Sequence, residues 1–151
     1  ALPIYQDQPL VRVIDGPGQD LFAIESLADF FSGTYEVSTQ SDRMGYRLVG
    51  PPLIHKDGAD IVSRGMAMGE IQVPGNGQPI VMMADHPTAG GYTSLGAVAR
   101  VDWPLLAQAQ PGLSKIKFTR IAVTDAQMEF IQAIDGLDAS MDEQEDVWLN
   151  L

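Results

Sequence analysis

The sequence contains no cysteine and only two histidines, His55 and His86, in its 151 residues. The lack of cysteine excludes disulfide bonds, thiolate nucleophiles and cysteine-based zinc sites, and with so few histidines we expect no metal site. No apolar run reaches the roughly 18 residues that a membrane span needs. The first ten residues, ALPIYQDQPL, lack the basic start and the apolar stretch of a signal peptide. These absences predict a cytoplasmic protein without a membrane partner.

Basic residues are scarce as well, and none follows residue 120. Residues 1–120 hold 12 acids and 9 bases, whereas residues 121–151 hold 8 acids and no base. Because no basic face is available to meet phosphates, nucleic acid is not an expected partner. Residues 136–151 are predicted to form an acidic, solvated and frayed tail. Its last apolar residues could still dock on a neighbouring lobe; these are Val147, Trp148, Leu149 and Leu151.

Short runs rich in strand-forming residues, bounded by glycine and proline, dominate the chain from residue 9 to about residue 101. Such punctuation is typical of strands joined by turns, and seven of them suggest a barrel or a sandwich. The predicted strands are Leu10–Ile14, Tyr35–Thr39, Tyr46–Val49, Gly69–Val73, Pro79–Met83, Ala97–Val101 and Lys115–Ile121.

Three other segments place apolar residues at helical spacing, namely Asp20–Phe31, Asp102–Gln110 and Thr124–Ile134. Asp102 precedes Trp103-Pro104, which suits an N-cap acceptor followed by a proline in the first turn. Thr124 is expected to cap the last helix in the same way. The sequence thus predicts one mainly β domain over residues 1–135 with short helices at its edges.

Residues 41–48, SDRMGYRL, place a capped turn before a strand. Arg43 and Arg47 have the same parity, so the two side chains could point to one face of the strand. One interpretation is a fork of guanidinium donors for a carboxylate or a phosphate. The other is an ordinary capped turn with two surface arginines.

Residues 69–96 contain the stronger signal, because two apolar strands there each end in a polar cluster, at 72–78 and at 85–92. Consecutive glycines can turn backbone N–H groups toward an anionic oxygen. Gly90 and Gly91 could form such a nest, while Asp85 and Tyr92 could handle a proton nearby. Hairpins use paired glycines too, so the nest and a plain turn both remain open. His86 precedes a proline and is expected in an extended loop.

Three ordered segments resemble signature segments of the allophanate hydrolase subunit 2 family: SDRMGYRL at 41–48, IQVPGNGQPI at 71–80 and DHPTAGGY at 85–92. This family includes the C subunit of 5-oxoprolinase and the biotin-dependent carboxyltransferase part of urea carboxylase and urea amidolyase. Its members usually have two related lobes, and the sequence resembles the C-terminal one from about residue 10 to residue 126. The resemblance implies a cyclophilin-like antiparallel β-barrel with two or three short flanking helices.

The resemblance also implies a function and partners. The first expectation is ATP-dependent opening of 5-oxoproline to glutamate, with the N-terminal lobe and a subunit 1-type partner, similar to the B subunit of 5-oxoprolinase. ATP would be used by that partner, and this lobe would bind no cofactor and would be inactive alone. One alternative is carboxyl transfer from carboxybiotin to urea. Another is a non-catalytic regulatory module that pairs with a kinase-inhibitor homologue.

The candidate site follows from the chemistry that the first two activities share. Lactam, urea and biotin ureido groups all build negative charge on an amide-like carbonyl oxygen as they react, so hydrogen-bond donors are needed. The expected catalytic residues are Arg43, Asp85 and Tyr92. The expected contacts to a small amide or lactam substrate are Gln72, Gln78, Thr88, Gly90 and Gly91.

Overall fold

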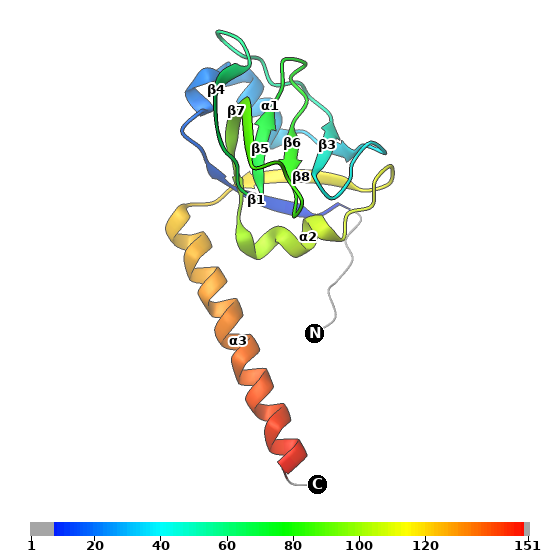
Figure 1. Ribbon diagram of the computed structural model, residues 1–151, viewed down its shortest axis with the longest axis vertical. Helices are drawn as coiled ribbons and strands as arrows, with labels where there is room; N and C mark the ends of the chain where they lie inside the picture. The colour runs from blue at the N-terminus through cyan, green and yellow to red at the C-terminus, as the bar shows by residue number, and fades with distance from the viewer. Residues whose placement is uncertain (1–7, 150–151) are drawn as a thin grey trace.

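The computed structural model describes the backbone of residues 8–149 and the side chains of residues 8–137. Eight strands form one sheet that closes on itself, and a long helix leads away from it (Figure 1). The strands are β1 Leu10–Asp15, β2 Tyr35–Val37, β3 Gly45–Val49, β4 Asp60–Gly65, β5 Glu70–Val73, β6 Ile80–Met82, β7 Ala89–Val98 and β8 Lys115–Arg120.

Seven strands make the barrel, in the order β1, β8, β2, β3, β6, β5 and β7, and β7 pairs back onto β1. The eighth strand, β4, pairs with the first half of β7 and stands outside this ring. The predicted mainly β barrel is confirmed, with one difference. Strands β1 and β8 run parallel, which their separation at opposite ends of the described chain permits, since a parallel pair needs a long connection.

The barrel interior is built by simple alternation along the strands. In β1 and β8 the residues Val11, Val13, Ile116 and Phe118 are buried, and each is flanked by more exposed neighbours. Phe30 of helix α1, Ile24–Ser32, stacks on Phe118 with ring centroids 4.7 Å apart. Burying such apolar side chains supplies most of the free energy of folding, and α1 therefore completes the core rather than merely flanking it.

The short helices differ from their predicted bounds. A 3-10 turn, η1 Gln19–Leu21, takes the start of the predicted first helix, because Phe22 leaves the helix to bridge with His55. A second 3-10 turn, η2 Arg100–Asp102, leads into α2, Trp103–Ala107, which ends before the predicted Gln110.

Strand β7 is the largest correction to the predicted elements. Of the predicted strand Ala97–Val101 only the first two residues are strand, as the end of β7, which begins at Ala89. The segment 89–92 is strand rather than loop. Its glycines suppress the strand signal, yet pairing with β5, β1 and β4 satisfies its backbone. β4 was not predicted, because its residues are largely exposed and lack the alternation of a half-buried strand.

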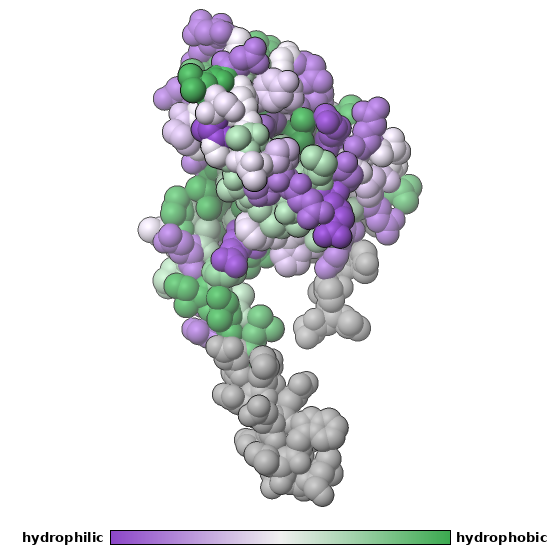
Figure 2. All heavy atoms as spheres, in the orientation of Figure 1, coloured by the Kyte–Doolittle hydropathy of each residue, from purple (hydrophilic) through white to green (hydrophobic). Residues whose placement is uncertain are grey.

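Helix α3, Val123–Leu149, is much longer than the predicted Thr124–Ile134, so the residues expected to fray are helical as far as Leu149. It begins one residue before Thr124, which is therefore not its cap. Apolar side chains gather on its first turns (Figure 2), where Met128 and Ile131 are more than half exposed. Within residues 8–149, no helix combines the length and the hydropathy that crossing a membrane requires. The predicted docking role of the last apolar residues, Val147, Trp148, Leu149 and Leu151, lies outside the described side chains.

The attachment of α3 and α2 to the barrel depends on Asp102. This buried carboxylate accepts hydrogen bonds from the backbone N–H of Arg12 at 2.8 Å and from its guanidinium at 2.6 and 2.9 Å. Asp102 stands at the N-cap position of α2 with Pro104 in the first turn, as predicted, but its side chain makes no cap bond to the helix. Glu129 of α3 pairs with the same guanidinium. The hydrogen bond to Asp102 raises the pKa of Arg12 above its ordinary value; partial burial opposes this rise, and Glu129 adds to it.

We predict that Asp102→Ala lowers the free energy of unfolding by about 3 kcal/mol, because a buried N–H of Arg12 and a partly buried guanidinium lose their acceptor. Chemical denaturation measures this loss. As a control, Asp15→Ala removes the half-exposed pair between Asp15 and Arg120 and is expected to cost less than about 1 kcal/mol. Equal losses in the two variants would contradict a special role for Asp102.

Candidate functional site

A cavity of about 280 Å³ lies against the outer wall of the barrel, between strands β3, β6 and β5 and the first half of β7. Its floor and sides are largely apolar. Four of the predicted site residues, Gln72, Gly90, Gly91 and Tyr92, line it together. The remaining lining residues are Asp42, Met44, Gly45, Arg47, Met66, Ile80, Met82, Pro87 and Ala89.

The wall of this cavity is a row of residues that are paired across three strands. Arg47 of β3 pairs with Ile80 of β6, and Ile80 pairs with Gln72 of β5. Directly paired residues project to the same face of a sheet. Their in-chain neighbours Ile71 and Val81 are buried in the barrel core. The row Arg47, Ile80 and Gln72 therefore faces outward, into the cavity.

Gln72 is the chemically distinctive member of this row. It is 3% exposed, and its amide nitrogen is buried without a hydrogen-bond partner, alone among the buried side-chain polar atoms of the described residues. A buried donor left unpaired costs about 1–3 kcal/mol. A flip of the side-chain amide exchanges its oxygen and nitrogen, so the buried atom without a partner is a donor in one orientation and an acceptor in the other. An amide-like group, which carries both an acceptor and a donor, is chemically complementary to either orientation.

A covering segment keeps Gln72 out of solvent. Arg64 at the end of β4 pairs with Glu70 of β5 at 2.5 Å, and Glu70 is 6% exposed. This pair holds the connection 65–69 against the barrel, and Met66 from that connection lies over Gly90. A Cβ on Gly90 would collide with Met66 Sδ and lie 2.9 Å from Gln72 Nε2. Close packing, rather than a turn, therefore explains the glycine at position 90.

The predicted glycine nest is wrong in its geometry. Gly90 and Gly91 lie in extended strand β7, and neither has the positive φ that a nest of alternating hand uses. Successive N–H groups of a strand point in opposite directions, so the pair cannot converge on one oxygen. Gly91 has more room than Gly90, since the nearest atom to its Cβ position is the Ile61 carbonyl oxygen at 3.2 Å.

Arg43 and Asp85 lie together, but beside the cavity. Arg43 Nε is 3.0 Å from an Asp85 carboxylate oxygen, and both side chains are more than half exposed. The backbone N–H of Asp85 also donates to the Arg43 carbonyl oxygen. Arg43 lines a neighbouring hollow with Tyr46, whose pKa is raised by burial. The structure thus joins the two predicted residues to each other while placing neither among the residues that line the cavity.

Two other predicted contacts have backbone partners. The Gln78 amide accepts from the Gly50 N–H at 3.0 Å and donates to the Gly50 carbonyl oxygen at 3.1 Å, so it joins two loops. Thr88 is exposed, and its carbonyl oxygen accepts the Met66 N–H. Neither residue is among those that line the cavity.

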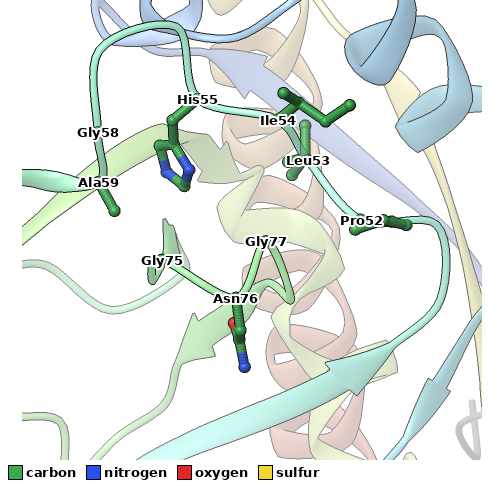
Figure 3. Close-up of a pocket in the computed structure, with 9 residues that line it drawn as sticks. All are labelled: Pro52, Leu53, Ile54, His55, Gly58, Ala59, Gly75, Asn76 and Gly77. Carbon is green, nitrogen blue, oxygen red and sulfur yellow. The ribbon is translucent and has the colours of Figure 1, made fainter.

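A larger hollow of about 460 Å³ lies between the segment 52–59 and the turn 75–77 (Figure 3). The ring of His55 reaches into it, but its Nε2 lies 3.0 Å from the Val73 carbonyl oxygen and the ring packs on Phe22. His55 is therefore engaged in the fold. His86, the other histidine, contacts the Pro87 carbonyl oxygen through Nδ1. The described residues contain no group of three or more acidic or histidine side chains that could hold a metal ion.

The site contains Asp42 and Arg47 in addition to the residues predicted for it. Asp42 Oδ1 accepts the N–H groups of Met44 and Gly45, as the predicted capped turn requires. The sequence pattern suggests Arg47 only as a partner of Arg43 on one face of a strand. Its proximity to Gln72 depends on strand pairing, which local spacing does not reveal.

Comparison with known proteins identifies the family. Residues 1–120 match the family described as carboxyltransferase domain, subdomain A and B. The chain is 37% identical over 116 residues to the C subunit of 5-oxoprolinase from Escherichia coli (strain K12), covering 77% of this chain and 37% of that protein. The corresponding protein of Haemophilus influenzae is 34% identical over 117 residues, with 78% and 38% covered.

Solved structures agree with this result. The crystal structure of the K. lactis urea amidolyase superposes with a TM-score of 0.77 at 25% identity, covering 84% of this chain and 8% of that one. The chain spans little more than a third of the length of the two 5-oxoprolinase proteins. The family predicted from the three signature segments is thereby confirmed, and the chain belongs to the carboxyltransferase domain family, subdomain A and B.

Proposed function

We propose that the cavity on the outer wall of the barrel binds the amide-like carbonyl group of a small substrate. The observation that carries this proposal is the unpaired, buried amide of Gln72. A carbonyl oxygen placed in the cavity would accept the N–H that no protein group accepts, and would remove the cost of leaving that donor unpaired. As negative charge builds on the oxygen during reaction, one fixed donor lowers the barrier by roughly 3–4 kcal/mol.

The proposed substrate is 5-oxoproline, with the chain acting as one lobe of a protein that resembles the C subunit of 5-oxoprolinase. The two bacterial 5-oxoprolinase proteins support it, because they match three quarters of this chain at 34–37% identity. The proposal includes an N-terminal lobe and a subunit 1-type partner, with ATP bound by the partner and no cofactor on this lobe. The chain alone would bind substrate but not turn it over.

Four of the eight predicted residues have a direct role in this proposal. The hydroxyl of Tyr92, which is 42% exposed on β7, would exchange a proton at the mouth of the cavity. Arg43 and Asp85 would act as positioning residues, because their ion pair and the Asp85 N–H tie the segment that carries Asp42 and Met44. Gln72 would contact the substrate directly.

A second candidate function is carboxyl transfer from carboxybiotin to urea. The close superposition on the K. lactis urea amidolyase, over 84% of this chain, favours it. Urea and the ureido group of biotin carry the same type of carbonyl, so Gln72 would have the same role. The two candidates differ in cofactor and in product, which makes them separable by assay.

The decisive assay uses the full-length protein assembled with its partner proteins. We expect glutamate to form from 5-oxoproline only when ATP is present, since opening a lactam against its stability requires coupling. The measurement is chromatographic detection of glutamate over time. Carboxylation of urea in the presence of a biotin carrier, without any glutamate from 5-oxoproline, would replace the first candidate with the second.

At the level of the site, we predict that Gln72→Leu weakens 5-oxoproline binding by about tenfold, as the loss of one hydrogen bond implies. Stability should not fall by more than about 1 kcal/mol, because the change removes an unpaired polar group. The matched control is Gln78→Leu, which strips Gly50 of two hydrogen bonds and should cost about 1–2 kcal/mol of stability while leaving affinity unchanged. Calorimetric titration and thermal unfolding of both variants measure the two effects. Unchanged affinity in Gln72→Leu together with weakened affinity in Gln78→Leu would rule out Gln72 as the contact.

The two glycines of β7 give another comparison. Gly90→Ala should reduce affinity by about tenfold, because the added Cβ displaces the Gln72 amide that holds the ligand. It should also lower stability by about 1–3 kcal/mol through overpacking. Gly91→Ala should do little, since its Cβ meets only the Ile61 carbonyl oxygen at 3.2 Å. The same titrations measure both affinities. A larger loss of affinity in Gly91→Ala than in Gly90→Ala would restore a role for the Gly91 N–H.

A further inference from the structure

Arg47 is distinguished from the other arginines by what surrounds its charge. Among the described side chains, Arg12, Arg43, Arg64 and Arg120 are paired with carboxylates, and Arg100 lies over two aromatic rings. No carboxylate or aromatic ring engages the guanidinium of Arg47 within residues 8–137. Its backbone N–H is held by the Ser41 hydroxyl at 2.9 Å, so the residue is fixed at its base while its charge stays available.

Arg47 also lies within reach of Gln72. Each is paired with Ile80, so they occupy the two ends of a three-residue row. Neighbouring strands lie about 4.8 Å apart, which places the Cα atoms of Arg47 and Gln72 roughly 10 Å from each other. Both side chains face the same cavity, with Ile80 between them. A small molecule that rests on Ile80 can therefore meet the amide at one end and the guanidinium at the other.

The surroundings determine which charge this second contact takes. Apolar side chains, including Met44, Met66 and Met82, form much of the lining, and Arg47 itself is exposed. The carboxylate of Asp42 also lines the cavity, where Oδ1 is occupied by two backbone N–H groups. A planar guanidinium matches a carboxylate in two-pronged geometry. An anionic group on the ligand is therefore favoured at the Arg47 end.

We infer that Arg47 binds the carboxylate of a ligand whose carbonyl is held by Gln72, so that the cavity selects small lactam or amide acids over neutral lactams and urea. This inference rests on the proposed function, because it assigns a second contact to the same site. It favours 5-oxoproline, which has a carboxylate beside its lactam ring, over urea, which has none. Arg47 is thus a specificity-determining residue.

The test compares two probes that differ only in the carboxylate, 5-oxoproline and 2-pyrrolidinone, by ligand-observed NMR titration of the 151-residue chain. We expect the wild-type chain to bind 5-oxoproline about tenfold more tightly, as a partly exposed charge-assisted contact implies. Arg47→Gln should abolish that preference and leave 2-pyrrolidinone affinity unchanged. Arg47→Lys should retain part of it, since the charge remains but the fork is lost. Lys117→Gln, an equal charge change at an exposed position of β8, should alter neither affinity.

The outcomes separate the two levels of the proposal. The inference is overturned if Arg47→Gln still binds 5-oxoproline more tightly than 2-pyrrolidinone, or if it weakens the binding of both probes equally. The carbonyl site still stands in that case, provided that Gln72→Leu weakens both probes. If the wild-type chain binds neither probe, the inference and the proposed carbonyl site both fall. Loss of the preference in Lys117→Gln would attribute it to net charge and overturn the role of Arg47.

Discussion

Strand β7 is the constraint on which the rest of the structure depends. Its second half pairs with β5 on one edge and with β1 on the other, and this closes the barrel. Its first half runs on past β1 and pairs with β4 instead. β4 gives the backbone of this extension hydrogen-bonding partners on that edge. One continuous strand therefore both closes the barrel and extends beyond it to pair with β4.

This extension, together with β4, covers part of the outer face of the barrel. On an uncovered barrel, the residues that alternate with the core face water and are polar without consequence. Here the β4 to β5 connection covers them, so Glu70 and Gln72 are polar residues in buried positions. Glu70 is neutralised by Arg64, whereas the Gln72 amide nitrogen has no partner. The fold therefore pairs one of these two buried polar groups and leaves the amide nitrogen of the other without a partner.

Several features of the fold were predictable because they depend on local pattern. Alternation in β1 and β8 identifies Val11, Val13 and Phe118 as core residues, and the turn at Asp42 follows from its place before a strand. The β4 strand and the true start of β7 were not predictable. Their residues have weak strand propensity, and they become strands only through pairing with each other. The hydrogen bonds of Asp102 were not predictable for a similar reason. Its sequence neighbours suit a helix cap, whereas its carboxylate accepts hydrogen bonds from Arg12, ninety positions away.

The sequence by itself determined the family, through three ordered motifs, the mainly β architecture and the segment 69–96 as the place to look for a site. Only the tertiary structure decided which of those residues meet. It brought Gln72, Gly90 and Tyr92 to one cavity and added Arg47 to them. Outside this cavity, Gln78 is hydrogen-bonded to Gly50, and Arg43 is paired with Asp85. The physical reason is that motifs record residue types along one chain, whereas a binding site depends on register between strands. A shift of one residue turns a side chain to the opposite face of the sheet.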